Sequence, residues 1–182
     1  MTSTVSLSAP AYAAGTVVAA DRPSPAWTLI KLRRDGLPPL RFSGRLIARY
    51  RGIAPRVALW HDLGLYRTAA ASFVVEIVAQ HLVPSPDIAP LEPSGFQVRP
   101  ARCHAALFET LDGALTRLET HDAACDVCPG ISAPALSFND PSIPPALLVM
   151  QATALQGFCG DVVRRYKIGV GAMLADIGLR DV

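Results

Sequence analysis

A histidine and two cysteines within one short segment have the spacing of metal ligands. They are His121, Cys125 and Cys128, in the pattern His-x3-Cys-x2-Cys. A closed structural zinc site needs four Cys or His ligands arranged as a tetrahedron. The fourth would come from one of three residues elsewhere in the chain: Cys103, His104 or Cys159. A lone CxxC is also typical of ordinary loop thiols or of a redox pair, so the pattern allows zinc as a cofactor without requiring it.

Four arginines alternate with apolar residues over 40–51, a pattern typical of a strand. They are Arg41, Arg45, Arg49 and Arg51. Side chains alternate across a strand, so we expect all four arginines on one face of a sheet. Guanidinium groups bind phosphate and carboxylate bidentately, and Tyr66 on the next strand would add a stacking surface. This face is predicted to bind nucleic acid or an acidic protein; the alternative is an ordinary solvated sheet face.

The charges are unevenly distributed along the chain. Residues 1–60 carry nine basic and two acidic side chains, whereas residues 61–182 carry eight basic and thirteen acidic ones. Such asymmetry indicates either a half that binds a polyanion or two halves that attract each other. The acidic second half could therefore cover the arginine face in place of an external anionic partner.

Cys159 is a candidate nucleophile because we expect a helix to begin just after it. A helix N-terminus lowers the pKa of a nearby thiol, and His104 or His61 would serve as its base. His61 and Asp62 are neighbours on one strand, so their side chains should point to opposite faces and not pair. The sequence has no GxxxxGK[ST], GxSxG or HExxH motif. A cysteine-dependent enzyme is thus the third hypothesis, after two non-enzymatic ones.

The elements that would position these residues form an α+β fold. An antiparallel sheet of about four strands is expected, with strands at 40–51, 57–68, 73–79 and 102–108 and a further candidate at 27–33. Thr110 is predicted to cap one helix over 111–121 that packs on the sheet. Two helices, 144–156 and 161–177, are expected to form a C-terminal hairpin.

Four regions are expected: a disordered tail over 1–25, a sheet-plus-helix domain over 26–122, an irregular linker over 123–143 and the helical hairpin over 144–182. The first twenty residues contain no Lys or Arg, unlike a secretory signal, so we expect a cytoplasmic location. A membrane span needs a run of about 18–20 apolar residues, and the sequence contains no such run, so we expect no membrane partner. The apolar run from Ala146 to Met150 indicates instead that residues 144–177 contact a second copy or another partner.

The stretch from Trp60 to Ile77 resembles small bacterial proteins built on a short meander and one helix. This resemblance implies a fold and no activity. The first hypothesis is a small non-enzymatic binding or regulatory protein that presents its arginine face to an anionic partner and forms a homo-oligomer through its C-terminal helices. The second is a zinc-stabilised protein-interaction module that uses His121, Cys125 and Cys128.

Overall fold

Five strands form one antiparallel meander in the order β1-β2-β3-β4-β5. The computed structural model describes residues 27–52, 58–84, 96–127 and 144–178, so the expected tail over 1–25 lies outside the described residues. The strands are β1 (Thr28–Leu32), β2 (Leu40–Arg51), β3 (Leu59–Thr68), β4 (Phe73–Pro84) and β5 (Phe96–Phe108). The α+β class is confirmed. The sheet has five strands instead of about four because β1 pairs with β2 along its whole length.

Helices follow the sheet in the described part of the chain: α1 (Leu111–Thr120), the 3-10 helix η1 (Ala123–Asp126) and α3 (Pro145–Gly178). Thr110 caps α1 as expected, because its hydroxyl accepts from the backbone N–H of Gly113 at 3.2 Å. The expected C-terminal hairpin is wrong, since α3 is a single helix of 34 residues. Gly157 and Gly160 lie inside this helix. Each lowers helix stability by only about 1 kcal/mol relative to Ala, and this penalty is too small to break a long helix.

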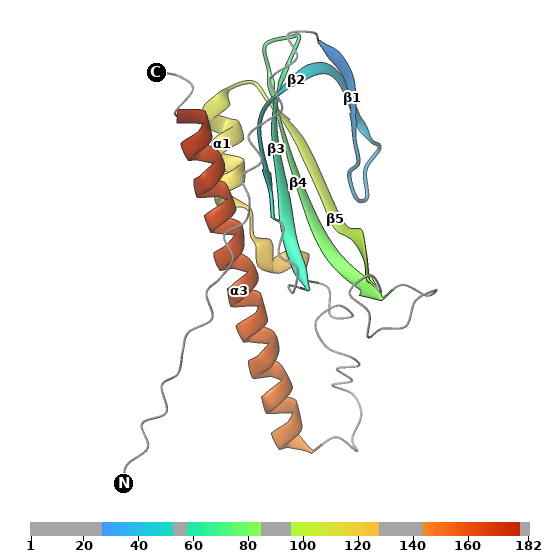
Figure 1. The fold of residues 1–182 in the computed structure, drawn as a ribbon, viewed down its shortest axis with the longest axis vertical. Coiled ribbons are helices and arrows are strands. Elements are labelled where there is room, and N and C mark those ends of the chain that lie inside the picture. Colours follow the sequence, from blue (N-terminus) through green and yellow to red (C-terminus); the bar gives the residue numbers. More distant parts are fainter. Residues whose placement is uncertain (1–26, 53–57, 85–95, 128–143, 179–182) are drawn as a thin grey trace.

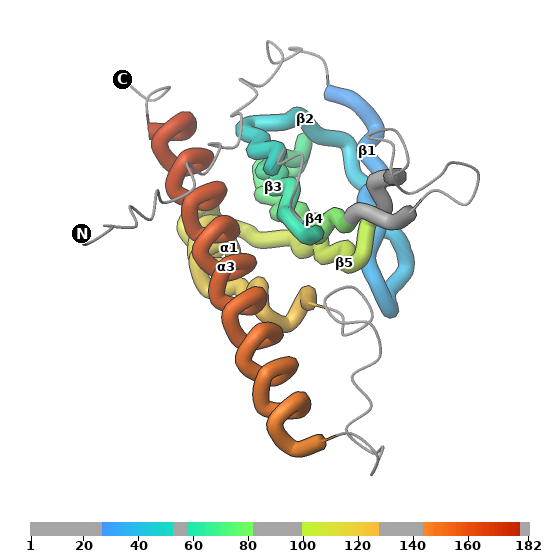
Figure 2. Tube along the Cα trace, turned by 60° about the horizontal axis from the view of Figure 1, so that its bottom comes forward, coloured from blue at the N-terminus to red at the C-terminus, as the bar shows by residue number. Residues whose placement is uncertain are grey.

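The sheet curls on itself, so that the β1–β2 hairpin approaches β5 (Figure 1 and Figure 2). Asp35 in the hairpin turn fixes this approach. Its backbone N–H donates to the carbonyl of Cys103 at 2.9 Å, and its carboxylate accepts from the backbone N–H of Cys103 at 3.0 Å. The inside of the curl is filled at this end by Leu32, Tyr66 and Val74, while α1 and α3 pack on the outer face.

A bulge in β2 divides its arginines between the two faces of the sheet. The register with β3 shifts between Leu46 and Ala48, so Ile47 is an extra residue. One extra residue reverses the alternation of the side chains beyond it. The outer face therefore receives Arg41 and Arg45, and the inside of the curl receives Arg49 and Arg51. The single arginine face expected from the sequence is wrong.

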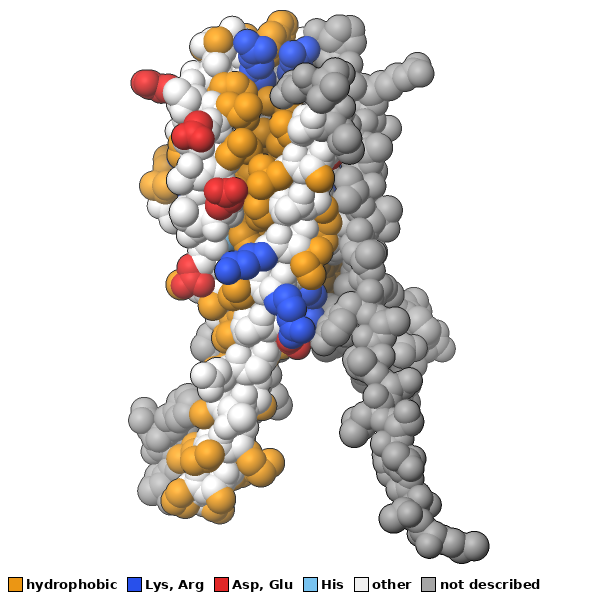
Figure 3. Space-filling model, turned by 90° about the vertical axis from the view of Figure 1, so that its left-hand side faces the viewer, with side chains coloured by type: hydrophobic (Ala, Val, Ile, Leu, Met, Phe, Trp, Pro, Cys, Tyr) orange, Lys and Arg blue, Asp and Glu red, His pale blue; other side chains and the backbone are white. Residues whose placement is uncertain are grey.

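The two halves of α3 have different surroundings. The C-terminal half packs on β2 and β3 through Tyr166 and its buried neighbours. The N-terminal half extends beyond the sheet (Figure 1), and hydrophobic side chains gather at its end (Figure 3). There, Leu147, Val149 and Met150 are 41%, 66% and 68% exposed. This end of α3 is an apolar surface that no described part of the chain covers.

Among the described residues, α3 alone has the length and apolar composition to cross a membrane, with a mean hydropathy of 1.4 over an 18-residue window. One such helix is weak evidence for a span. The expectations of no membrane partner and of a second copy at residues 144–177 therefore both stay predictions.

Candidate metal centre

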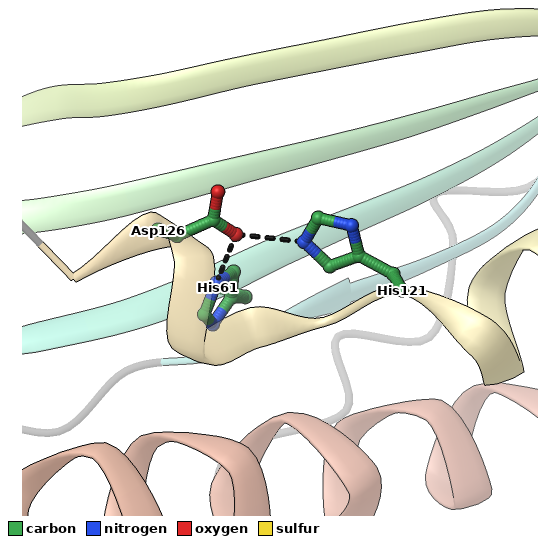
Figure 4. Close-up of side chains that lie close together, drawn as sticks. All are labelled: His61, His121 and Asp126. Carbon is green, nitrogen blue, oxygen red and sulfur yellow. Dashed lines mark hydrogen bonds and ion pairs between the residues drawn. The ribbon is translucent and has the colours of Figure 1, made fainter. Parts of the chain in front are cut away.

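Three histidines converge on one carboxylate between the sheet and the corner where α1 meets η1. Asp126 Oδ2 lies 3.0 Å from His61 Nε2 and 2.7 Å from His121 Nε2 (Figure 4). The other carboxylate oxygen, Oδ1, lies 2.7 Å from His104 Nε2. These four residues are called the His–Asp cluster below.

The cluster is buried except at one histidine. The side chains of His61, His121 and Asp126 are 2%, 5% and 1% exposed, whereas that of His104 is 35% exposed. Burial by itself would raise the pKa of Asp126, but the hydrogen bonds from the three histidines outweigh burial and hold this pKa well below its usual range. Asp126 is therefore a buried anion that depends on the donors, or on a cation, beside it.

The alternation of side chains along two strands brings His61 and His104 to the helix-covered face. His61 pairs with Ala79, and His104 pairs with Ile77 on the same strand β4, two positions away. Positions two apart share a face, so both imidazoles point toward the helices. The expectation that His61 and Asp62 point to opposite faces is confirmed, because Asp62 contacts Gln80 on the inside of the curl.

Two caps bring the other members of the cluster into place. His121 is the C-cap residue of α1, so its side chain leaves the helix where the chain turns back toward the sheet. Asp122 is the N-cap of η1, and its carboxylate accepts from the backbone N–H of Ala124 at 3.0 Å. This short turn places Asp126 five residues after His121 and opposite β3.

Tyr166 of α3 closes the cluster from the helix side. Its ring centroid lies 5.1 Å from that of His61 and 5.3 Å from that of His121. Its hydroxyl donates to the backbone carbonyl of Leu118 at 2.6 Å, and burial raises the pKa of this hydroxyl. The long helix is thereby attached both to α1 and to the cluster.

The second ring nitrogen of His121 indicates where its proton lies. Arg117 Nη2 is 3.5 Å from His121 Nδ1. An arginine only donates, so Nδ1 accepts, and Nε2 carries the hydrogen that is donated to Asp126. A metal ion at Nε2 would replace this hydrogen. Metal and proton therefore compete for the same nitrogen.

The donor set fits a divalent transition metal. One ligand atom from each of His61, His121 and Asp126 lies within 4.8 Å of the other two. In a tetrahedral zinc site with bonds of about 2.0–2.2 Å, two ligand atoms lie about 3.3–3.6 Å apart, so a pair at 4.8 Å would have to approach by about 1.5 Å to close the site. His104 Nε2 contacts the other oxygen of Asp126 and lies outside this group of three. Imidazole and carboxylate ligands suit zinc and the neighbouring first-row metals.

Cys103 and Cys125, two of the cysteines predicted as ligands, lie apart from the cluster. Cys103 is buried on β5 directly before His104, so its side chain points to the opposite face of the sheet. Cys125 is exposed, and its thiol donates to the Asp122 carboxylate at 3.2 Å. Cys128 lies outside the described residues. Of the predicted metal ligands that the structure describes, His121 and the alternative fourth ligand His104 belong to the cluster.

The expectation that a helix begins just after Cys159 is wrong. The helix α3 begins at Pro145 and continues past Cys159, whose thiol is therefore not at a helix N-terminus. The two histidines considered as its base, His61 and His104, are both hydrogen bonded to Asp126. The geometry on which the cysteine-enzyme hypothesis depended is absent from this part of the chain.

Sequence reasoning found the right segment and missed the acidic residue within it. Asp126 lies between the two cysteines of the CxxC pattern. A signal for His61 was present, because it alternates with Leu59 and Leu63 on the apolar side of a strand. A polar group at such a buried position needs a hydrogen-bonding partner, and that partner is Asp126.

Comparison of the chain with protein-family models, curated proteins and solved structures gives no match. The fold and the cluster together define a small α+β domain with a candidate metal centre. Its function is inferred from this geometry.

Proposed function

We propose that this protein is a zinc-stabilised domain in which His61, His121 and Asp126 hold one divalent metal ion and His104 supplies the fourth ligand. The observation that carries the proposal is the convergence of three imidazole Nε2 atoms on one buried carboxylate. Four protein ligands make a closed site, which is typical of structural zinc. The ion would fasten the α1–η1 corner to β3 and β5.

This proposal keeps the zinc hypothesis and replaces its cysteine ligands. His121 and the alternative fourth ligand His104 remain, while Asp126 and His61 take the place of the cysteines. The closed, buried arrangement supports a structural ion that stiffens the domain for partner binding. Because metal displaces protons from imidazole, affinity for the ion should fall as pH decreases.

Metal analysis of protein purified without added zinc tests this assignment. We expect about one metal ion per chain in the wild type, as a closed four-ligand site would hold. We expect its loss in His61→Ala and in Asp126→Asn. Cys125→Ser is the matched control, since it changes the same segment and should keep the metal. Retention of the metal in both ligand variants, or its absence from the wild type after titration with zinc, would overturn the proposal.

A second candidate function is binding of an anionic partner by the outer face of the β1–β2 hairpin. The bulge leaves Arg41 and Arg45 there, and the register places Lys31 opposite Arg41 and Arg67 opposite Arg45. Directly opposed residues share a face, so these four cations form an outer basic patch. Arg45 also lies 5.6 Å above the Trp27 ring, which supports its guanidinium group. The partner proposed is nucleic acid or an acidic protein.

Salt dependence distinguishes this patch from a merely solvated surface. Binding of a fluorescent single-stranded oligonucleotide should weaken as salt increases, because phosphate contacts release counterions. The double variant Arg41→Gln/Arg67→Gln should weaken it further, whereas Arg102→Gln, an arginine outside the patch, should not. No binding of the oligonucleotide or of an acidic polypeptide at low salt would exclude this function.

A further inference from the structure

The inside of the curled sheet contains a polar cavity of about 300 Å³, on the face opposite to the His–Asp cluster. Its polar lining consists of Arg49, Arg51, Asp62, Glu76 and Gln80. Apolar side chains fill the curl at its other end. The polar end is therefore a distinct compartment inside a curved sheet, a location where small ligands commonly bind.

A glycine in the middle of β3 makes room for this arrangement. Gly64 pairs with Arg49 on one side and with Glu76 on the other. A Cβ atom at this position would lie 2.9 Å from Tyr66 Cε2 and 3.1 Å from Glu76 Oε2. Because Gly64 has no Cβ atom, the Tyr66 ring can lie against its backbone. The Tyr66 hydroxyl then donates to Glu76 at 2.6 Å and accepts from Arg49 at 2.9 Å.

The four charges around the cavity are held apart from one another. Within the described ranges, no ion pair joins the two arginines to the two acids. Neutral groups separate them instead: the Tyr66 hydroxyl lies between Arg49 and Glu76, and Asp62 accepts from the backbone N–H of Gly52 and from Gln80, each at 3.2 Å. The β2 side of the cavity is therefore cationic, and the β3–β4 side is anionic.

Gln80 holds one of the two acids in place. Its Nε2 donates to Asp62 at 3.2 Å, and its Oε1 atom is buried, with no hydrogen bond to any described residue. Because Oε1 is closed off from solvent, Gln80 contributes to the anionic side of the cavity through its contact with Asp62.

We propose that this cavity binds a small zwitterion of amino-acid size, with its carboxylate on Arg49 and Arg51 and its ammonium group on Asp62 and Glu76. The lining is neutral overall, with two cations facing two anions, so a ligand carrying one charge of each sign compensates both sides. A cavity of about 300 Å³ is at the lower end of ligand sites, which fits a small molecule. The site is independent of the metal centre, because it lies on the other face.

Calorimetric titration of the protein as purified with glycine, β-alanine and γ-aminobutyrate tests the proposal. These probes separate the two charges by increasing distances. Each is compared with its carboxylate-only analogue (acetate, propionate, butyrate) and its amine-only analogue (methylamine, ethylamine, propylamine). We expect the best zwitterion to bind at least about tenfold more tightly than either of its analogues, since each lost charge removes charge-assisted hydrogen bonds.

Variants on the two faces of β2 provide the matched control. Arg49→Gln and Arg51→Gln should each weaken binding of the best probe by at least about tenfold. Arg45→Gln, on the same strand but the opposite face, should not change it. Arg51 is exposed, so its variant tests the site even if Arg49→Gln does not fold. The proposal is overturned if no probe binds at about 10 mM, or if a one-charge analogue binds as tightly as its zwitterion. It is also overturned if Arg45→Gln weakens binding of the best probe as much as Arg51→Gln does.

Discussion

His61 on β3 and Asp126 in η1 are 65 residues apart in the chain, yet their side-chain atoms Nε2 and Oδ2 are 3.0 Å apart. This contact, repeated by two more histidines, joins the sheet to the turn after α1. Removing Asp126 would leave the buried donors His61 and His121, and the partly exposed His104, without their common acceptor. The stability of the fold and the metal binding proposed for this cluster should therefore be lost together.

The first prediction is that Asp126→Ala lowers the free energy of unfolding by about 3 kcal/mol or more, the usual cost of breaking a buried charge network. Urea denaturation with and without a chelator measures this loss. Asp161→Ala is the control, because Asp161 pairs with Arg164 on the surface, where an ion pair contributes about 0–1 kcal/mol. The lowered pKa of Asp126 stabilises the fold above about pH 4, and this stabilisation is lost as pH falls. Equal losses in the two variants would contradict the prediction.

A second prediction concerns two glycines of α3. A Cβ at Gly169 would lie 2.5 Å from Cε1 of Tyr50, whereas one at Gly171 would meet nothing within 4 Å. Gly171→Ala should therefore stabilise the protein by about 0.5–1 kcal/mol through helix propensity. Gly169→Ala should destabilise it by about 1–3 kcal/mol through overpacking. Thermal unfolding of the two variants measures both effects, and a stabilising Gly169→Ala would show that α3 does not pack closely on β2.

Much of this packing could be predicted from the sequence. The strands alternate clearly, and Thr110 is a strong cap. The predicted gap between helices 144–156 and 161–177 does not exist, because a helix interior tolerates a glycine such as Gly157 when its neighbours continue the helix. The bulge at Ile47 has no local signal, since it appears only once β3 defines the register.

The candidate site was predictable only in its local part. His121 and the segment around Asp126 are close in sequence, so their spacing was visible. His61 and His104 reach them through the pairing of three strands, and that pairing depends on long-range register. Of the described residues in the CxxC pattern, Asp126 is buried and Cys125 is exposed, and the spacing of the cysteines gives no signal for this aspartate.

A third prediction follows from Asp62. Burial raises the pKa of its carboxyl group, and the hydrogen bonds from Gln80 and Gly52 only partly oppose this effect. A raised pKa stabilises the fold at low pH, and that contribution is lost as pH rises through the folded-state pKa. Asp62→Asn should thus gain stability relative to the wild type between pH 3.5 and pH 7. Urea denaturation across this range measures the difference in unfolding free energy between Asp62→Asn and the wild type. Glu119→Gln, at an exposed position, is the control. A difference between Asp62→Asn and the wild type that does not change with pH would contradict the prediction.

A fourth prediction concerns the thiol of Cys125. The hydrogen bond to Asp122 and the charge of that carboxylate raise the pKa of the Cys125 thiol. The thiolate is the reactive form, so Cys125 should react with a disulfide reagent near pH 7 more slowly than free cysteine, although it is exposed. Asp122→Asn should accelerate the reaction. Mass spectrometry of the modified peptide separates Cys125 from the buried Cys103, and a rate above that of free cysteine would reopen a redox role.

The last prediction addresses the N-terminal half of α3. Val149 and Met150 are 66% and 68% exposed at the end of a helix that extends past the sheet. Exposed apolar area of this kind usually marks a contact surface, so we expect concentration-dependent self-association in sedimentation velocity. Val149→Lys/Met150→Lys should reduce it. Leu29→Lys, which changes an equally apolar residue that is 81% exposed on β1, should not. Sedimentation as a monomer together with flotation on lipid vesicles would show instead that a membrane covers this end of the helix.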